Sequence, residues 1–464
     1  MTTGGGPAVT HTAVSGAPPA PPPPPGPRRT AFAEGADRLR AAATTEPGRL
    51  RVIGAVVALL VVAFGAVTAW QTAGRAAAAD DVLTGSQPLS SEAADIYRSL
   101  ADANTAASSG FLAGGQETKA ARERYEEDIR TAAAKLVTAA AGSEPGSPAT
   151  ATITELNRLL PQYKGLIERA RTYNRQGFPV GGAYLRHANA TMQDEMLPAA
   201  QELYEGENRR LRGDYAEAMP YPWAAIALGV LALAALARVQ RRTYLRTNRV
   251  LNPGLLAATA AATVALVWLV AGHSVARAHL VDSRDHGVRS LDVLHDARVA
   301  SLKARGNENL TLVARGAETR KAGGTTYDAY DLDYRREMDV LTARLADAGR
   351  LADDRAGRRP VTAAAGNTAQ WRERHAAARA QDENGNYRQA LEKVIGGEGA
   401  TGECFDNVDA HLAAALAHEE NEFARAAEAG RDALAGLPAG AAVLGVLGAA
   451  GAVLGIGRRL SEYR

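Results

Sequence analysis

The sequence contains one cysteine, Cys404, among 464 residues, and only 5% of its residues are aromatic. A single thiol excludes an internal disulfide framework and a cysteine-rich metal site. We expect Cys404 to be a small buried apolar side chain. Because aromatic residues are few while 46% of the residues are hydrophobic, alanine carries much of the apolar content. This composition favours long helices with thin cores over β-sheets.

Catalytic and cofactor motifs are also missing from the sequence. No nucleophile elbow, phosphate-binding glycine loop or kinase signature occurs. His279 and His286 are seven residues apart, as are His411 and His418, whereas metal-binding histidines on one helix are usually three or four apart. We therefore expect ordinary helix-surface histidines, no metal or cofactor, and no enzymatic activity. The formal net charge of +2 gives no indication of a nucleic-acid partner.

Two long apolar runs organise the middle of the chain. Residues 223–239 and 254–272 are long enough to cross a bilayer as helices, and neither run contains Asp, Glu or Lys. The loop between them is rich in arginine, including Arg241, Arg242 and Arg246. The positive-inside rule places this loop in the cytoplasm.

Two further apolar runs lie near the ends of the chain. Val52–Trp70 follows an arginine-rich stretch, and Ala439–Gly457 is followed by two arginines. These charges predict four transmembrane helices with both termini in the cytoplasm. Residues 1–49 contain the run Pro21–Pro25 and resemble a disordered tail, with a docking segment for a cytoplasmic partner as the alternative.

The segments between the spans show helical periodicity. Four successive apolar stripes in residues 72–221, separated by glycine and proline, predict an antiparallel four-helix bundle, and the pattern returns in residues 274–437. The predicted fold class is an all-α membrane protein with four transmembrane helices and two extracellular antiparallel helical bundles. The predicted segments are a tail (1–49), spans (50–71, 222–239, 254–273, 438–457), bundles (72–221, 274–437), a cytoplasmic arginine-rich loop (240–253) and a cytoplasmic stub (458–464).

The two predicted bundles share an ordered set of residues, which indicates a tandem duplication packed as a pseudo-symmetric pair. The matches are Ala113, Gly115, Glu117 and Thr118 with Ala314, Gly316, Glu318 and Thr319; Tyr125, Asp128 and Arg130 with Tyr330, Asp333 and Arg335; Gln162, Tyr163 and Gly177 with Gln370, Trp371 and Gly385; and Glu207–Asn208 with Glu420–Asn421.

Three sets of residues are candidates for interactions. The repeated motif and the glycine-rich stretch 396–402 fall at turns far from the membrane, where an extracellular protein partner could dock. Gly451 and Gly455 form a small-residue face for another span or a second copy of the chain. The cytoplasmic arginines anchor the topology and are candidates for docking a cytosolic partner. The candidate residues are Gly115, Glu117, Thr118, Gly316, Glu318 and Thr319 at the tips, and Arg241, Arg242 and Arg246 in the loop.

The span–bundle arrangement resembles the four-helix-bundle sensor domains of bacterial receptors, but it lacks a HAMP linker, kinase or methyl-accepting domain. In topology, length and composition, the chain also resembles the GlnX family of actinobacterial four-span membrane proteins. That resemblance implies amino-acid sensing through an extracellular solute-binding lipoprotein and a cytosolic Ser/Thr kinase, and it provides no site residue. A signal-transducing receptor or adaptor is therefore expected, with a structural cell-envelope scaffold as the alternative.

Overall fold

The computed structural model describes residues 46–114, 117, 119–247, 252–322 and 325–461, and its backbone is almost entirely helical. The first half of the chain forms α2 (Glu46–Asp81), η1 (Val82–Ser86), α3 (Gln87–Leu112), α4 (Lys119–Gly142), α5 (Pro148–Arg175), α6 (Val180–Thr191), η3 (Met192–Met196), α7 (Leu197–Ala218) and α8 (Trp223–Thr247), where η marks a π-helical turn. The second half forms α9 (Pro253–Asp282), η4 (Ser283–Val288), α10 (Arg289–Ala314), β1 (Thr319–Ala322), β2 (Thr325–Asp328), α11 (Ala329–Leu351), α12 (Arg355–Glu383), α13 (Tyr387–Ile395), α14 (Thr401–Leu434) and α15 (Leu437–Ser461).

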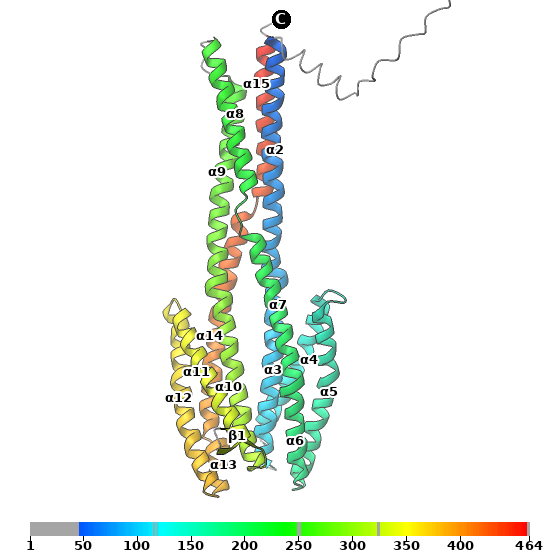
Figure 1. Cartoon of the computed structure of the whole chain (residues 1–464), viewed down its shortest axis with the longest axis vertical. Helices are drawn as coiled ribbons and strands as arrows, with labels where there is room; N and C mark the ends of the chain where they lie inside the picture. Colours follow the sequence, from blue (N-terminus) through cyan, green and yellow to red (C-terminus); the bar gives the residue numbers. More distant parts are fainter. Residues whose placement is uncertain (1–45, 115–116, 118, 248–251, 323–324, 462–464) are drawn as a thin grey trace, which may run out of the picture.

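Two helical paths run without a break through most of the length of the molecule (Figure 1). One joins α2, η1 and α3 over Gly48–Leu112, and the other joins α9, η4 and α10 over Pro253–Ala314. Each path therefore continues from an apolar segment into a bundle helix. The π-helical turns η1 and η4 lie at the same place in the two paths, between these two parts.

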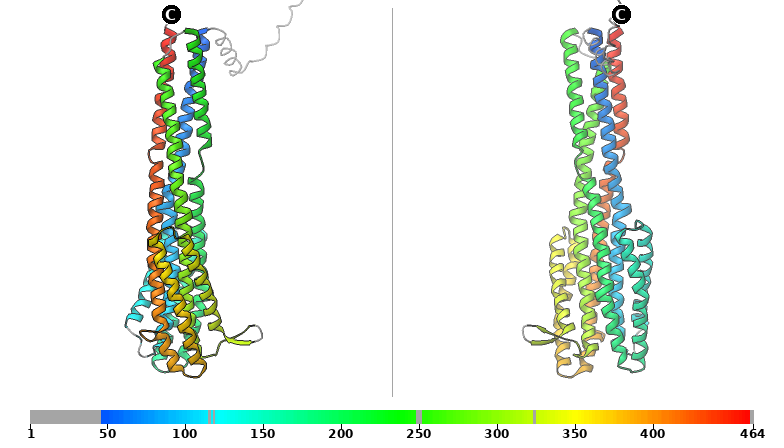
Figure 2. Two further views of the ribbon diagram at one scale, coloured as in Figure 1. Left: turned by 90° about the vertical axis from the view of Figure 1, so that its left-hand side faces the viewer. Right: turned by 45° about the vertical axis from the view of Figure 1, so that its right-hand side comes forward.

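The helices that follow fold back along the end of each path. α4 packs on α3 and α11 packs on α10, while α5 and α12 lie farther out. Figures 1 and 2 show α4 and α5 on one side of the central helices and α11 and α12 on the other. Since α3 also packs against α10, the two halves meet along these two helices.

A single hydrophobic core runs through both halves. Its largest fully buried side chains are aromatic and aliphatic residues of α3, α4, α5 and α12. A second cluster lies between the bundles and the apolar segments, and it joins the two helical paths to α7 and α14. These core residues include Ile96, Leu100, Leu156, Tyr163, Met338, Trp371 and Leu412 in the first cluster and Val82, Leu211, Tyr215, Leu280 and Phe423 in the second.

Four helices within the described residues are long and apolar enough to cross a membrane, as the sequence predicts. They support a multi-pass membrane protein. The beginning of α2, the end of α8, the beginning of α9 and the end of α15 lie at one end of the molecule (Figure 1). Glycines bring the backbones of α2 and α15 close together, since a Cβ added to Gly65 would lie 2.8 Å from Cα of Gly445. Such small-residue contacts are typical of helices packed in a bilayer.

One element departs from the all-helical expectation. β1 and β2 form an antiparallel hairpin between α10 and α11, with Thr319 opposite Asp328. Figure 2 shows this hairpin projecting from the end of the second half. A two-stranded hairpin is at best marginally stable alone, and here the Arg320 guanidinium anchors it through two hydrogen bonds of 2.8 and 3.2 Å to the Asp333 carboxylate.

The pattern of buried positions favours different partners for two of the expected residue matches between the two halves. Along α4 the buried side chains include Tyr125, Ile129 and Leu136, and along α11 Tyr334, Met338 and Leu345 follow at the same spacing. Tyr125 therefore corresponds to Tyr334, one helical turn beyond the expected Tyr330. In α7 and α14, the buried Glu207 corresponds in the same way to Glu419 and not to Glu420. In contrast, Tyr163 and Trp371 are both buried at the expected positions.

Candidate functional site

Polar side chains lie in the contact between α3 and α10. The hydroxyl of Thr105 donates a hydrogen bond of 3.0 Å to the backbone oxygen of Leu302. The side-chain amide of Asn309 donates to the hydroxyls of Ser108 and Ser109 over 3.0 and 2.8 Å. Because buried polar groups must find partners, these bonds specify how α3 sits against α10 more sharply than apolar packing would.

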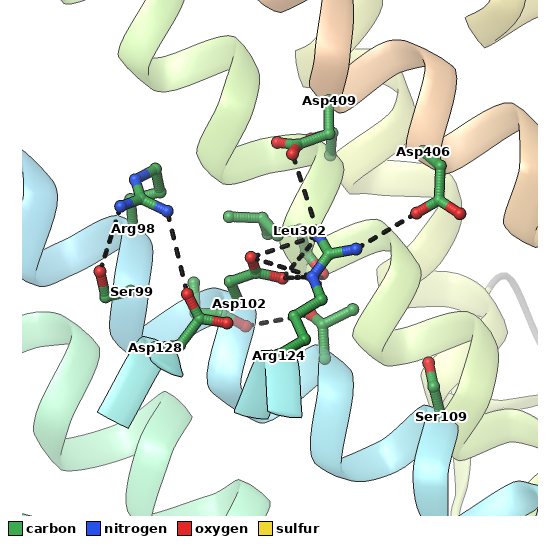
Figure 3. Close-up of polar contacts among 12 residues, drawn as sticks. Arg98, Ser99, Asp102, Ser109, Arg124, Asp128, Leu302, Asp406 and Asp409 are labelled. Carbon is green, nitrogen blue, oxygen red and sulfur yellow. Dashed lines mark hydrogen bonds and ion pairs between the residues drawn. The ribbon is translucent and has the colours of Figure 1, made fainter. Parts of the chain in front are cut away.

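Arg124 of α4 connects the first half to the second (Figure 3). Its guanidinium donates a hydrogen bond of 3.2 Å to Asp102 of α3 and one of 3.3 Å to Asp406 of α14. A third carboxylate, Asp409 of α14, lies 3.8 Å away. Asp409 in turn accepts a 2.7 Å hydrogen bond from Arg298 of α10. The chain of charges therefore links four helices, two from each half.

A second carboxyl group, Asp128, is buried beside Asp102. Burial, and after it the neighbouring charge of Asp102, raise the pKa of Asp128 to about 8. The guanidinium of Arg98, 4.0 Å away, opposes this shift. Asp128 therefore holds its proton more tightly than an exposed carboxyl group does, while Asp102 is the acid that pairs with Arg124. A change in the charge near Arg124 would alter the balance between these two acids.

An open groove of about 550 Å³ lies next to this junction. Its wall in the first half comes from α3 and α4, and its wall in the second half comes from α10 and from residues 395–407. Charged groups of both signs line it, together with the buried ring of Phe405. The charged lining residues are Asp102, Arg124, Arg305, Glu403 and Asp406. Such mixed lining can hold a small polar molecule, or a polar segment of a protein, through charge-assisted hydrogen bonds.

Arg305 connects the groove to a buried charged network inside the second half. Its guanidinium donates to Glu308 over 2.6 Å and to the backbone oxygen of Val394 over 3.1 Å. The indole nitrogen of Trp371 donates to the same Glu308 carboxylate over 3.2 Å. Since Arg305 and Glu308 are both almost fully buried, neither charge could lose its partner without a large cost.

His375 of α12 completes this network. Its Nδ1 lies 2.9 Å from Glu308 and its Nε2 lies 3.0 Å from Asp331, and its ring stacks on Tyr334 with centroids 3.6 Å apart. A neutral imidazole has one N–H and would direct a lone pair at one of the two carboxylates, so this geometry requires the doubly protonated ring. Burial lowers the pKa of His375, but the hydrogen bonds to Asp331 and Glu308 outweigh burial, and the net shift is upward.

The predicted tip residues lie in different environments in the two halves. Gly115 and Thr118 are outside the described residues. Glu117 is tucked inward, with a 17% exposed side chain, and pairs with the buried Arg171 over 3.1 Å. Glu318 is 52% exposed and lies 3.7 Å from Arg186 of α6.

Of the remaining residues predicted at the tips, those before and in the hairpin do not line the groove, whereas part of the glycine-rich stretch does. Gly316 has a φ of 76° before the hairpin, and Thr319 begins β1. Of the predicted loop 396–402, Gly396, Gly397 and Gly402 line the groove.

The predicted arginine and glycine sites lie at the other end of the molecule. Arg241 and Arg242 are exposed near the end of α8, and the side chain of Arg246 is outside the described set. Gly451 and Gly455 of α15 lie against α9, since a Cβ added to Gly254 would come within 2.6 Å of Cα of Gly455.

The groove was not predicted, because its residues come from four separate segments. The polar residues Asn309 and Glu308 on a buried helix face were the available signal.

Comparison with known proteins supports a sensing role. A family model described as an actinobacterial sensor domain matches residues 78–216, which run from the end of α2 to α7. No curated protein and no solved structure matches the chain. Residues 78–216 are therefore similar to a sensor domain of the kind found in actinobacteria. It covers the α3 and α4 wall of the groove and ends before the second half.

Proposed function

We propose that this protein is a membrane receptor or adaptor that senses an extracellular cue at the groove between its two halves and relays it to a separate cytosolic protein, without catalysing a reaction. The observation that carries the proposal is the continuity of α2 with α3 and of α9 with α10. The two paths meet at the groove, so a ligand that changes their contact acts on both membrane segments.

The π-helical turns supply a place where the two paths can change shape. Ser283 in η4 contacts the hydroxyl of Tyr215 over 2.7 Å and donates to the backbone oxygen of Phe423 over 3.3 Å. A Cβ added to Gly287 would lie only 3.0 Å from Phe423. Single π-turns within α-helices often occur at functional positions. Their place at the base of both bundles suits a joint between sensing and membrane parts.

The proposed orientation has both bundles outside the cell and both termini inside. The arginines near the ends of α2, α8 and α15 support it through the positive-inside rule. The corresponding elements and buried positions of the two halves support an origin by tandem duplication. In a variant without Cys404, cysteines introduced by Ser147→Cys and Thr362→Cys should react with an impermeant maleimide on intact cells. Thr243→Cys should react only after lysis, and labelling of Thr243→Cys in sealed cells would contradict this orientation.

The proposed partners follow from the resemblance to GlnX-type proteins. An extracellular solute-binding lipoprotein carrying glutamate or aspartate would dock at the outer end of the bundles, where Glu318 and the hairpin lie exposed. A cytosolic Ser/Thr kinase would dock near Arg241 and Arg242, which are exposed at the end of α8. Further copies of the chain would associate through the membrane helices.

The experiment compares two arginines of α4 in the full-length protein. Arg124→Ala removes the link between the two halves, whereas Arg122→Ala removes an exposed pair with Glu126 in the same helix. Phosphorylation of cytosolic proteins is measured after glutamate or aspartate is supplied to cells. We expect deletion of the gene and Arg124→Ala to abolish the response and Arg122→Ala to retain it. A response unchanged by gene deletion would reject the receptor proposal and favour an envelope scaffold.

A further inference from the structure

A set of three possible metal ligands lies where the α11–α12 turn meets α14. The side chains of Asp354, His418 and Glu422 each bring one donor atom to within 4.8 Å of the others. Nε2 of His418 lies 3.3 Å from the Asp354 carboxylate and 3.7 Å from that of Glu422. His418 and Glu422 are one helical turn apart and so project from the same face of α14.

The imidazole nitrogen is the unusual member of this set. The His418 side chain is 23% exposed, but its Nε2 atom is buried and makes no hydrogen bond among the residues that the structure describes. It lies within ion-pair distance of two carboxylate oxygens, 3.3 Å from that of Asp354 and 3.7 Å from that of Glu422, without a well-aligned hydrogen bond to either. A buried polar atom without a hydrogen bond needs an explanation, and a bound ion is one.

The separations fit ligands that share one ion. Donor atoms bound to Zn²⁺ at about 2.0–2.1 Å in a tetrahedron lie roughly 3.3–3.4 Å from one another. Two of the three separations are already 3.3 and 3.7 Å, so small side-chain rotations would complete the set. One imidazole with two carboxylates also suits a first-row transition metal better than Mg²⁺ or Ca²⁺, which prefer oxygen ligands alone.

The surroundings are acidic and closely packed. Glu419, next to His418, is buried, and a Cβ added to Gly357 would lie 3.1 Å from its carboxylate and 3.2 Å from the His418 ring. Excess negative charge beside an imidazole favours a cation.

The first half lacks this set of ligands. Ser147 caps α5 where Asp354 caps α12. The register given by the buried pair Glu207 and Glu419 places Gly206 opposite His418 and Arg210 opposite Glu422. These residues provide no comparable ligand set, and the arginine would repel a cation.

We infer that Asp354, His418 and Glu422 form a binding site for a divalent transition-metal ion, with Zn²⁺ as the ion that the ligand set matches best. The ion would join the α11–α12 turn to α14, the helix that leads into α15. Figure 1 shows this turn at the end of the bundle nearest the apolar segments. Metal occupancy would therefore stiffen the second half close to the membrane, independently of what the groove binds.

The test uses the purified full-length protein after removal of metal by a chelator. Zn²⁺ and Mg²⁺ are titrated by calorimetry into the wild type and into three ligand variants, His418→Ala, Glu422→Gln and Asp354→Ser. Serine keeps the helix cap, as Ser147 shows, while it removes the carboxylate. His411→Ala, on the same helix, is the matched control, and circular dichroism checks the helicity of each protein.

We expect the wild type and His411→Ala to bind one more Zn²⁺ per chain than the ligand variants, or to bind Zn²⁺ with an affinity at least tenfold higher. Both proteins should also gain thermal stability when Zn²⁺ is added. The inference is overturned if wild type and His418→Ala bind Zn²⁺ alike, or if His411→Ala loses as much binding. Binding of Mg²⁺ as tight as that of Zn²⁺ would also reject a transition-metal site. If His418→Ala fails to fold, the two carboxylate variants decide the outcome.

Discussion

The two halves of the molecule build the same helical frame around different interiors. In the first half, the buried hydroxyl of Tyr163 donates a 3.2 Å hydrogen bond to the neutral side chain of Asn104. At the corresponding place in the second half, Trp371 donates to the carboxylate of Glu308. One frame therefore accepts either a neutral polar pair or a set of charges, provided that each buried group has its partner.

The difference extends one turn along the outer helices. The position of His375 in α12 corresponds to Ile167 in α5, and both side chains are buried. The first half fills this position with an apolar side chain, whereas the second half holds an imidazolium between Glu308 and Asp331. At this position the second half should thus depend on charge balance, whereas the first half depends on packing.

The largest expected effect comes from removing the centre of the charged network. Glu308→Ala leaves Arg305 and His375 without their common partner, and breaking a buried ion pair costs about 3–5 kcal/mol. The matched change in the first half, Asn104→Ala, leaves Tyr163 and Asn189 unpaired and should cost about 1–3 kcal/mol. Hydrogen exchange of α10 and α3 in the full-length protein measures both losses. Equal losses would contradict the contrast between the interiors.

A smaller effect separates the two copies of the tip motif. Glu117→Gln weakens the pair with the buried Arg171 and should cost roughly 1–2 kcal/mol. Glu318→Gln alters an exposed pair with Arg186, which is worth less than about 1 kcal/mol. Thermal unfolding of the two variants compares them directly. A larger loss for Glu318→Gln would show that the hairpin supports the fold more than its exposure indicates.

The pH dependence should also differ between the halves. The raised pKa of His375 contributes stability that is complete below its ordinary pKa of 6.5 and is lost as the pH rises through the higher folded value. The raised pKa of Asp128 contributes stability that is complete below its ordinary pKa of 3.8 and is lost as the pH rises to the folded pKa of about 8.

Each group can change the free energy of unfolding by at most about 1.4 kcal/mol per pH unit. The free energy of unfolding is measured at a series of pH values from about 5 to about 9, a range that spans both titrations. Variants of the two residues separate their contributions. His375→Gln should flatten the profile of stability against pH above pH 6.5. Asp128→Asn should flatten it below about pH 8. Profiles unchanged by either variant would show that neither group has a pKa that differs between the folded and unfolded protein.

Much of the frame could be predicted from the sequence because it depends on strong local patterns. Long apolar runs and apolar stripes identified the four candidate membrane helices and most bundle helices. The match of Tyr125 with Tyr330 failed because identical residue types occur one helical turn apart, and only burial distinguishes Tyr330 from Tyr334.

The groove and the charged network could not be predicted in the same way. Arg124 and Asp406 are far apart in the sequence, and their contact depends on how the two halves pack. His375 has no distinguishing local motif, and its role depends on carboxylates from α10 and α11. The hairpin was missed because its strands are only four residues each, too short for a clear alternating pattern.

The most direct test of the account locks the two halves together at their contact. Thr105 and Gly306 face each other across α3 and α10, with the Thr105 oxygen 3.8 Å from the position of a Cβ at Gly306. This spacing suits a disulfide between Thr105→Cys and Gly306→Cys in a variant without Cys404. The measurement is phosphorylation of cytosolic proteins after glutamate or aspartate is supplied. We predict no response when the disulfide is formed and a restored response after reduction. A full response from the locked protein would contradict a relay through movement of the two halves.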